Sequence, residues 1–154
     1  MRGFGQPFTW DELNADRTIW TVPAARLKRK VRQEGRENLR VPLSSRAREI
    51  LTIVEEYKLS DTYVFCGYNR KTLDDAALRK LMHVMEVPVT PSGFRASFKT
   101  WATAQNYEWL LVELALDHAI GNDVSARYYR DDALEQRRPM MQAWSDHCGG
   151  RSQT

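Results

Sequence analysis

Cysteine is scarce in this chain, and the positions of the two cysteines indicate neither a disulfide nor a metal site. The 154 residues include two cysteines, Cys66 and Cys148, which lie far apart and lack the short spacing of metal ligands. We therefore expect neither a structural disulfide nor a metal site, as is typical of proteins of the reducing cytoplasm. The sequence also lacks any run of about 18 apolar residues and any signal-peptide core, so we expect a soluble cytoplasmic protein with no membrane partner.

Neither charge nor hydrophobicity is extreme. Apolar residues make up 42% of the chain and charged residues 28%, which is the range of globular rather than disordered proteins. This length suffices for one domain with a buried core. The formal net charge is only +3, but seven of the fifteen residues from Arg26 to Arg40 are basic and two are acidic. This local excess of positive charge matters more than the total.

Two extended runs flank the basic segment. Thr18 to Val22 is rich in β-branched and aromatic residues and ends at Pro23, and Leu39 to Leu43 forms a second run after Gly35. This pattern predicts a β-hairpin with a long arm. With little apolar content to anchor it, the arm should project into solvent or onto a polyanion, and a merely solvated charged loop is the alternative. The basic residues of the arm are Arg26, Lys28, Arg29, Lys30 and Arg32.

Helical periodicity dominates the rest of the chain. Ser44 or Ser45 can cap a helix whose apolar positions run through Tyr57, and a second helix, with a capping-box-like start at Thr72 to Asp75, should reach Met85. We expect a stripe on the second helix to pack in the core and His83, off that stripe, to be exposed. The stripe consists of Leu78, Leu81, Met82 and Met85.

Three further helices are expected after Pro91. The first begins near Ser92 and places Phe94, Phe98 and Trp101 in the core, the second is a buried helix within Glu108 to Leu116, and the third covers 133–144. The fold class is therefore mainly α with a small β-hairpin, an α+β arrangement. We expect the tail 149–154 to be disordered.

Arg95, His118 and Tyr128 are the candidates for chemistry. Arg95 should lie near a helix N-terminus, which favours anions, and its guanidinium matches two phosphate oxygens. The alternative for Arg95 is an ion pair with a carboxylate on a helix surface. His118 precedes Tyr128 by ten residues in a basic neighbourhood, which suggests chemistry on a phosphodiester. The alternatives for this pair are a core histidine and a packing tyrosine.

Three segments together resemble the catalytic domain of the tyrosine recombinases, the phage integrase family. They are WTVPAARLKRK, TPSGFRASFKTWA and LALDHAIGNDVSARYYRDD, and the resemblance extends from about Trp10 to Trp144. It implies the tyrosine-recombinase catalytic-domain fold over 1–148. It also implies that the first strand or helix region and the separate N-terminal domain that clamps DNA are absent. The family's first active-site arginine would fall at or before Met1.

The resemblance also implies the roles of the site residues. In the family pattern LxHxxGxxxxxxY, Leu116, His118, Gly121 and Tyr128 are in register, which makes Tyr128 the nucleophile and Tyr129 the competing candidate. Arg95 matches the arginine of the family's HxxR motif, where Ser92 replaces the histidine. Lys28 matches the hairpin lysine that acts as a general acid on the leaving 5′ oxygen. The residues expected to contact the DNA backbone are Arg26, Arg29, Lys30 and Arg32.

The implied function is site-specific DNA recombination through a covalent 3′-phosphotyrosyl intermediate, with no metal or cofactor. Double-stranded DNA would be the partner, so the protein would associate with the nucleoid of a bacterial cell, and the helix 133–144 could mediate self-association. Ser92 and the missing first arginine leave open a second function from another class, DNA binding by a non-catalytic remnant. A serine can donate a hydrogen bond, but it cannot exchange a proton near neutral pH as imidazole can.

Overall fold

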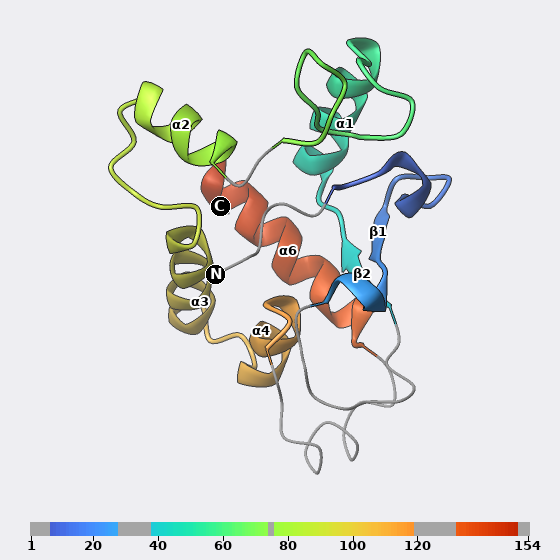
Figure 1. Cartoon of the computed structure of the whole chain (residues 1–154). Helices are drawn as coiled ribbons and strands as arrows, with labels where there is room; N and C mark the ends of the chain where they lie inside the picture. The colour runs from blue at the N-terminus through green and yellow to red at the C-terminus, as the bar shows by residue number, and fades with distance from the viewer. Residues whose placement is uncertain (1–6, 28–37, 74–75, 119–131, 151–154) are drawn as a thin grey trace.

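The computed structural model is mainly helical with a two-stranded antiparallel sheet, which confirms the predicted α+β class. The long helix α6 (Leu134–Cys148) runs through the middle of the molecule, and the hairpin and the helices α1, α3 and α4 surround it (Figure 1). Within the described part of the chain, no helix is long and apolar enough to cross a membrane. The structure describes residues 7–27, 38–73, 76–118 and 132–150.

The predicted hairpin is present. Strand β1 (Ile19–Val22) pairs antiparallel with β2 (Leu39–Pro42), so that Val22 lies opposite Leu39. Two short 3-10 helices flank β1 in the sequence, η1 (Trp10–Glu12) before it and η2 (Ala24–Arg26) after it. Most of the expected long arm, residues 28–37, lies outside the described residues.

Helix α1 (Ser45–Glu56) begins after Ser44, whose side-chain oxygen accepts a hydrogen bond from the backbone N–H of Ala47 at 3.3 Å. Of the two serines that could cap this helix, Ser44 is therefore the cap. Leu51 is buried, as the apolar stripe predicts. Ile50 and Tyr57, also among the apolar positions of this stripe, are 39% and 76% exposed, so their assignment to the core is wrong. Tyr57 lies beyond the end of the helix at Glu56.

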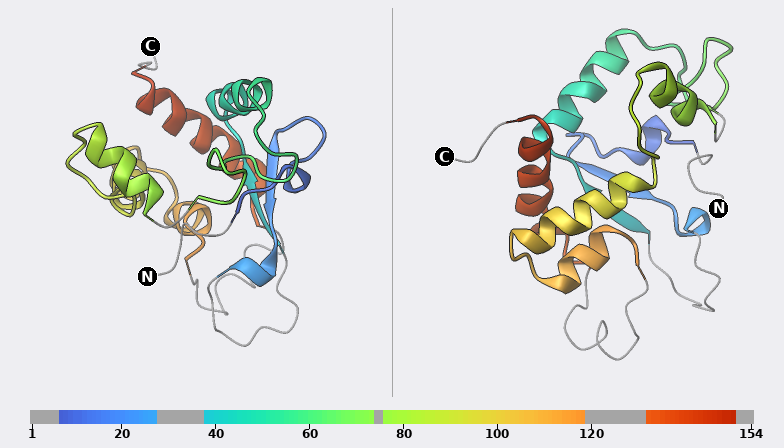
Figure 2. Two further views of the ribbon diagram at one scale, coloured as in Figure 1. Left: turned by 45° about the horizontal axis from the view of Figure 1, so that its top comes forward. Right: turned by 90° about the vertical axis from the view of Figure 1, so that its left-hand side faces the viewer.

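The main core lies between α6, α3 (Gly93–Ala104) and α4 (Trp109–Ala115), which pack against one another (Figure 2). Trp101 and Trp144 flank this core with their ring centroids 5.1 Å apart. Phe98 is buried and Trp101 is partly buried against the core, as expected, but Phe94 is 51% exposed and does not belong to it. The buried residues of this cluster are Phe98, Ala102, Val112, Leu116 and Met140.

Helix α2 (Ala77–Val84) corrects the prediction of a buried apolar stripe. Met82 is buried, but Leu78, Leu81 and Met85 are exposed. Because α2 lies at the edge of the molecule (Figure 1), among the described residues it has only a narrow contact face, which Met82 occupies. His83 is exposed, as predicted. The proposed capping box includes positions 74–75, which lie outside the described residues.

Helix α6 extends four residues beyond the predicted boundary at Trp144 and ends at Cys148. Ala133, which precedes it, is buried and has a left-handed backbone conformation with φ of 53°. A residue with a Cβ atom rarely adopts this conformation unless its surroundings hold it there. The surroundings of Ala133 therefore hold the start of α6 in this conformation. The contacts at this helix start are described with the candidate site.

Candidate functional site

Arg95 lies in the first turn of α3, where the sequence places it, and it is exposed. Its Nη2 donates a hydrogen bond to the carbonyl oxygen of Leu116, at the end of α4. Within the described residues no carboxylate forms an ion pair with Arg95, which disfavours the alternative of a surface ion pair. A guanidinium carries five N–H groups, and the bond to Leu116 uses one of them. Arg95 therefore lies beside the end of α4 with capacity to bind an anion.

Ser92 directly precedes α3 and its side chain makes no capping hydrogen bond. The hydroxyl of Thr90 instead accepts a hydrogen bond from the backbone N–H of Gly93, at 3.2 Å. Ser92 is half-buried, with an α-helical backbone conformation. The position that matches the histidine of the HxxR motif thus carries a hydroxyl group that does not cap α3.

His118 follows the end of α4, two residues after Leu116. Its Nδ1 lies 2.6 Å from a carboxylate oxygen of Glu113, and the Nζ atom of Lys99, on α3, lies 2.7 Å from the other oxygen. The Glu113 side chain is 9% exposed, whereas that of His118 is 39% exposed. His118 is therefore a partly exposed imidazole whose Nδ1 contacts a buried carboxylate, and not a core histidine.

The charge of Glu113 is stabilised by its partners. Burial alone would raise the pKa of its carboxyl, but the hydrogen bonds from Lys99 and His118, with their positive charges, outweigh burial and lower the pKa below its ordinary value. Since the pKa is lower in the folded protein, these contacts add stability above the unfolded-state pKa. That stability is lost as the pH falls through the folded-state value. Glu113 therefore remains ionised at neutral pH.

The bond from Arg95 to Leu116 ties the start of α3 to the end of α4. The bonding partner lies two residues before His118 in the chain. Arg95 and Leu116 also line a pocket of about 250 Å³ between α2, α3, α4 and α6, in which Arg95 is the one charged residue among the described lining residues. The other lining residues are Leu78, Pro91, Phe94, Phe98, Ala115 and Met141.

Arg26 does not project into solvent, and this expectation is wrong. Its side chain is 15% exposed, and its guanidinium pairs with the carboxylate of Glu12 and donates to the carbonyl oxygen of Pro7. Glu12 also accepts a hydrogen bond from Nε1 of Trp20 at 2.9 Å. The cause is η2, the turn after Pro23, which directs Arg26 back toward η1. Arg26 therefore contributes to the base of the hairpin.

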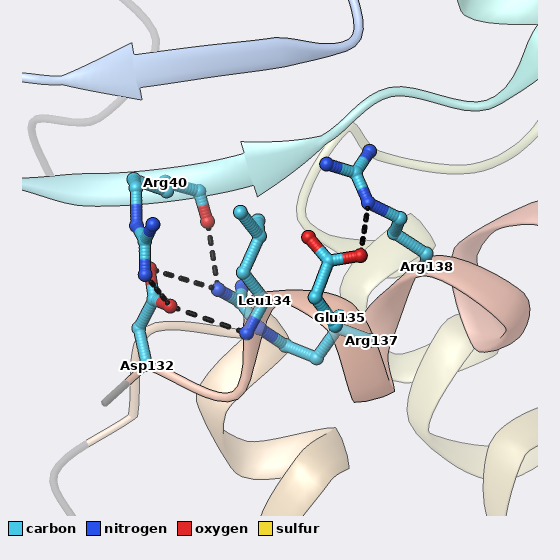
Figure 3. Close-up of polar contacts among 6 residues, drawn as sticks. All are labelled: Arg40, Asp132, Leu134, Glu135, Arg137 and Arg138. Carbon is cyan, nitrogen blue, oxygen red and sulfur yellow. Dashed lines mark hydrogen bonds and ion pairs between the residues drawn. The ribbon is translucent and has the colours of Figure 1, made fainter. Parts of the chain in front are cut away.

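A cluster of three charged residues joins β2 to the start of α6 (Figure 3). Both oxygens of Asp132 bind the guanidinium of Arg40, at 2.7 and 3.0 Å. Arg137, whose side chain is 1% exposed, donates to the carbonyl oxygen of Arg40 at 2.7 Å and lies 3.4 Å from Asp132. Asp132 also accepts from the backbone N–H of Leu134 at 3.2 Å. We call Arg40, Asp132 and Arg137 the β2–α6 cluster.

The β2–α6 cluster ties together the borders of two segments that carry predicted site residues. Arg40 follows the basic arm in sequence, and Asp132 comes four residues after Tyr128. The described ends of these segments are therefore adjacent, although they are 92 residues apart in the chain. The remaining predicted site residues lie outside the described residues: Lys28, Arg29, Lys30, Arg32 and Tyr128, with the competing Tyr129.

Sequence patterns alone do not identify Glu113, Lys99 or the β2–α6 cluster. Glu113 lies five residues before His118, a spacing at which two side chains meet only if a helix ends between them in a particular way. The usual signal for that ending is glycine, and here Asp117 adopts the left-handed conformation instead, with φ of 51°. The left-handed Asp117 thus explains why the sequence pattern does not reveal the pair.

Comparison with known proteins finds several integrases that are similar to this chain. The chain is 32% identical over 144 residues to prophage integrase IntA of Escherichia coli strain K12, covering 89% of this chain and 33% of that protein. It is 30% identical to the integrase of Enterobacteria phage P4 over 153 residues, or 90% of this chain and 35% of the relative. The integrase of Shigella phage Sf6 is 30% identical over 142 residues, with coverages of 89% and 35%.

The chain thus spans about a third of the length of these relatives. No family model and no solved structure matches it. The matches nevertheless extend over about nine-tenths of the chain, including the parts that carry Arg95 and His118. Because several integrases match at this identity and coverage, the chain belongs to the phage integrase family.

Proposed function

We propose that this chain is the catalytic portion of a site-specific DNA recombinase, covering 1–148, which cleaves double-stranded DNA through a tyrosine. The observation that carries the proposal is the hydrogen bond from Arg95 to the carbonyl oxygen of Leu116, two residues before His118, in a member of the phage integrase family. Two donor side chains anchored at the same helix end would suit the non-bridging oxygens of a phosphate.

In the proposed reaction the hydroxyl oxygen of Tyr128 attacks a backbone phosphorus and the 5′ oxygen of the next nucleotide leaves. The product is a 3′-phosphotyrosyl bond and a free 5′ hydroxyl. Lys28 protonates the leaving oxygen, and the proton that the Tyr128 hydroxyl gives up on attack passes to water, so that the step balances. Since one ester bond replaces another, the energy of the phosphodiester is kept, and attack by the 5′ hydroxyl of another strand completes the exchange with no external energy source.

A neutral phenol is a weak nucleophile, so the protein has to stabilise the charge that develops on the phosphate. Arg95 and His118 would donate hydrogen bonds to the non-bridging oxygens, and each preorganised donor is worth about 3 kcal/mol of transition-state stabilisation. The β2–α6 cluster supports the proposal further, since it holds the borders of the arm with Lys28 and of the segment with Tyr128 next to each other.

A second candidate function is DNA binding without strand cleavage. Ser92 favours it, because this residue stands where the family motif has a histidine. The two functions share the basic arm and the phosphate-binding side chains but differ in the covalent step. They are therefore separated by whether the DNA becomes attached to the protein.

The experiment that separates the two functions uses a nicked duplex from which cleavage releases a short strand that diffuses away. A recombinase domain accumulates a covalent adduct that survives a denaturing gel. A binding protein shifts the duplex in a native gel and leaves no adduct. If the chain neither shifts nor cleaves DNA of any sequence, including the attachment sites of related phages, both functions are wrong.

DNA affinity should depend on the basic arm. Replacing Arg29, Lys30 and Arg32 with Ala should weaken binding to all sequences, because each phosphate that the protein no longer neutralises keeps its condensed counterions. The slope of log affinity against log salt concentration should flatten by about 0.9 for each such phosphate. The measurement is a titration of labelled duplex DNA at several salt concentrations.

A matched variant controls for the total charge of the protein. Arg46, Arg48 and Arg79 are exposed arginines on α1 and α2, outside the arm in the sequence. Replacing all three with Ala removes the same charge and should leave the slope nearly unchanged. Equal slopes for the two triple variants would show that the arm holds no special place in DNA binding.

Ser92→His should raise the rate of adduct formation if the chain cleaves DNA. The hydroxyl of Ser92 does not cap α3, so the substitution should leave the fold intact. An imidazole at the motif position adds a general acid–base group, which typically contributes ~10² to 10⁴-fold. The measurement is the single-turnover rate of adduct formation, with Ser92→Ala as the control. A rate for Ser92→His no higher than that of the parent chain would contradict the prediction.

A further inference from the structure

The backbone at the end of α4 brings His118 into contact with Glu113. The backbone N–H of His118 donates to the carbonyl oxygen of Glu113 at 3.0 Å, and that of Asp117 donates to the carbonyl oxygen of Leu114 at 3.2 Å. With Asp117 in the left-handed conformation, these two bonds form a standard helix-ending motif. Glu113 and His118 are thus joined through the backbone as well as through their side chains.

The chemistry of the side-chain contact fixes where the imidazole carries its protons. An ionised carboxylate can only accept hydrogen bonds, so at 2.6 Å from Glu113 the Nδ1 atom of His118 must carry the proton that it donates. Neutral imidazole has a single N–H group, and in this arrangement Nε2 then bears a lone pair. Nε2 can donate to a phosphate oxygen only when the ring is protonated.

We infer that Glu113 is a positioning residue for His118, one that fixes the Nδ1–H form of the ring so that His118 serves the phosphate only as an imidazolium. The inference rests on the proposed function for the phosphate, but the proton placement stands on the contacts alone. Lys99 binds the second oxygen of Glu113 and so keeps the first oxygen directed at Nδ1.

Four charged or titratable groups among the described residues surround this imidazole. They are the carboxylates of Glu113 and Asp117 and the cationic side chains of Lys99 and Arg95 on α3. Of the four, Glu113 is the most buried and is in direct contact with the ring. Because Nε2 donates a hydrogen bond only in the imidazolium, the rate of adduct formation should fall as the pH rises and the ring loses its proton.

The direct test is NMR of the imidazole nitrogens in the whole chain labelled with isotopic histidine. The chain has three histidines, and His118→Asn identifies the signals of His118 by their loss. We expect Nδ1 of His118 to carry a proton in both the charged and the neutral ring, so that the proton lost from the imidazolium comes from Nε2. If the neutral ring of His118 in the unmodified chain carries its proton mainly on Nε2, the inference is wrong.

Glu113→Gln provides the matched perturbation, because it keeps the shape of the side chain and removes its charge. The amide of Gln can donate to Nδ1 as well as accept from it, so the neutral ring should become a mixture of both tautomers. The control is Glu49→Gln, which removes a carboxylate from an exposed ion pair with Arg46 at 3.0 Å. A tautomer ratio for His118 that responds equally to both substitutions, or to neither, would contradict the positioning role.

A kinetic measurement connects this role to the reaction. Glu113→Gln should slow adduct formation roughly tenfold to a hundredfold at neutral pH, by analogy with the carboxylates that orient metal-binding histidines. The decline of its rate with pH should also become shallower than in the parent chain. An unchanged rate and pH profile would overturn the role in catalysis. If neither protein forms an adduct, the proposed function fails, and the NMR result alone decides the proton placement.

Discussion

Tyr128→Phe should abolish formation of the covalent DNA adduct while changing DNA affinity less than about tenfold, because the aromatic ring stays and a single hydrogen bond contributes about 0.5–1.5 kcal/mol net. The hydroxyl oxygen is the atom that would attack the phosphorus, and no other group on Phe can replace it. The measurement compares adduct yield on the nicked duplex with the affinity from a native-gel titration of the same protein.

Tyr129→Phe is the matched control for Tyr128. Adjacent residues point about 100° apart on a helix and to opposite faces of a strand, so only one of the two hydroxyls can reach a phosphate bound by Arg95 and His118. Tyr129→Phe should keep the adduct. The assay is run on the chain itself and on a version extended upstream to supply the family's first arginine. Loss of the adduct in Tyr129→Phe alone would reverse the assignment.

Arg137→Met should lower the free energy of unfolding by about 3 kcal/mol, the lower end of the range for breaking a buried ion pair. Methionine fills much of the space of the arginine stem, so the loss of stability reports the polar contacts rather than a cavity. Those contacts include the bond to the carbonyl oxygen of Arg40 and the approach to Asp132. Asp132 keeps its bidentate bond to Arg40, which is why we expect the lower end of the range.

Arg138→Met controls for Arg137, since it removes the same charge from the next residue of α6. Arg138 is more exposed and pairs with Glu135 at 2.9 Å, within one turn of the helix (Figure 3). Pairs of this kind contribute less than about 1 kcal/mol. Arg138 also donates a long hydrogen bond to the carbonyl oxygen of Thr18, in a distant segment, at 3.4 Å. Urea denaturation of both variants measures the difference. Equal losses of stability would show that the β2–α6 cluster is not a central support of the fold.

Local patterns predict those parts of the fold that local physics determines. The hairpin follows from β-branched runs on both sides of the arm, and the start of α1 from the capping side chain of Ser44. The position of Arg95 in the first turn of α3 follows from the prolines before it. Each of these features depends on residues within a few positions of one another, so the sequence contains the whole cause.

The failures concern contacts between distant segments. The sequence predicts an exposed Arg26, but this residue pairs with Glu12, fourteen residues earlier, because η2 directs it toward η1. Arg40 and Asp132 are 92 residues apart, and no periodicity relates them. On α2, the apolar stripe indicates a helix correctly, but which side chains become buried depends on what packs against the helix. Such tertiary contacts have no signature in a single sequence.

Mass spectrometry of the covalent complex trapped on the nicked duplex, after protease and nuclease digestion, identifies the residue that forms the bond to DNA. We expect one modified peptide, with the nucleotide on Tyr128. A nucleotide on Tyr129 would contradict the register that relates His118 to the nucleophile, and DNA binding that never yields a modified peptide would contradict the covalent mechanism.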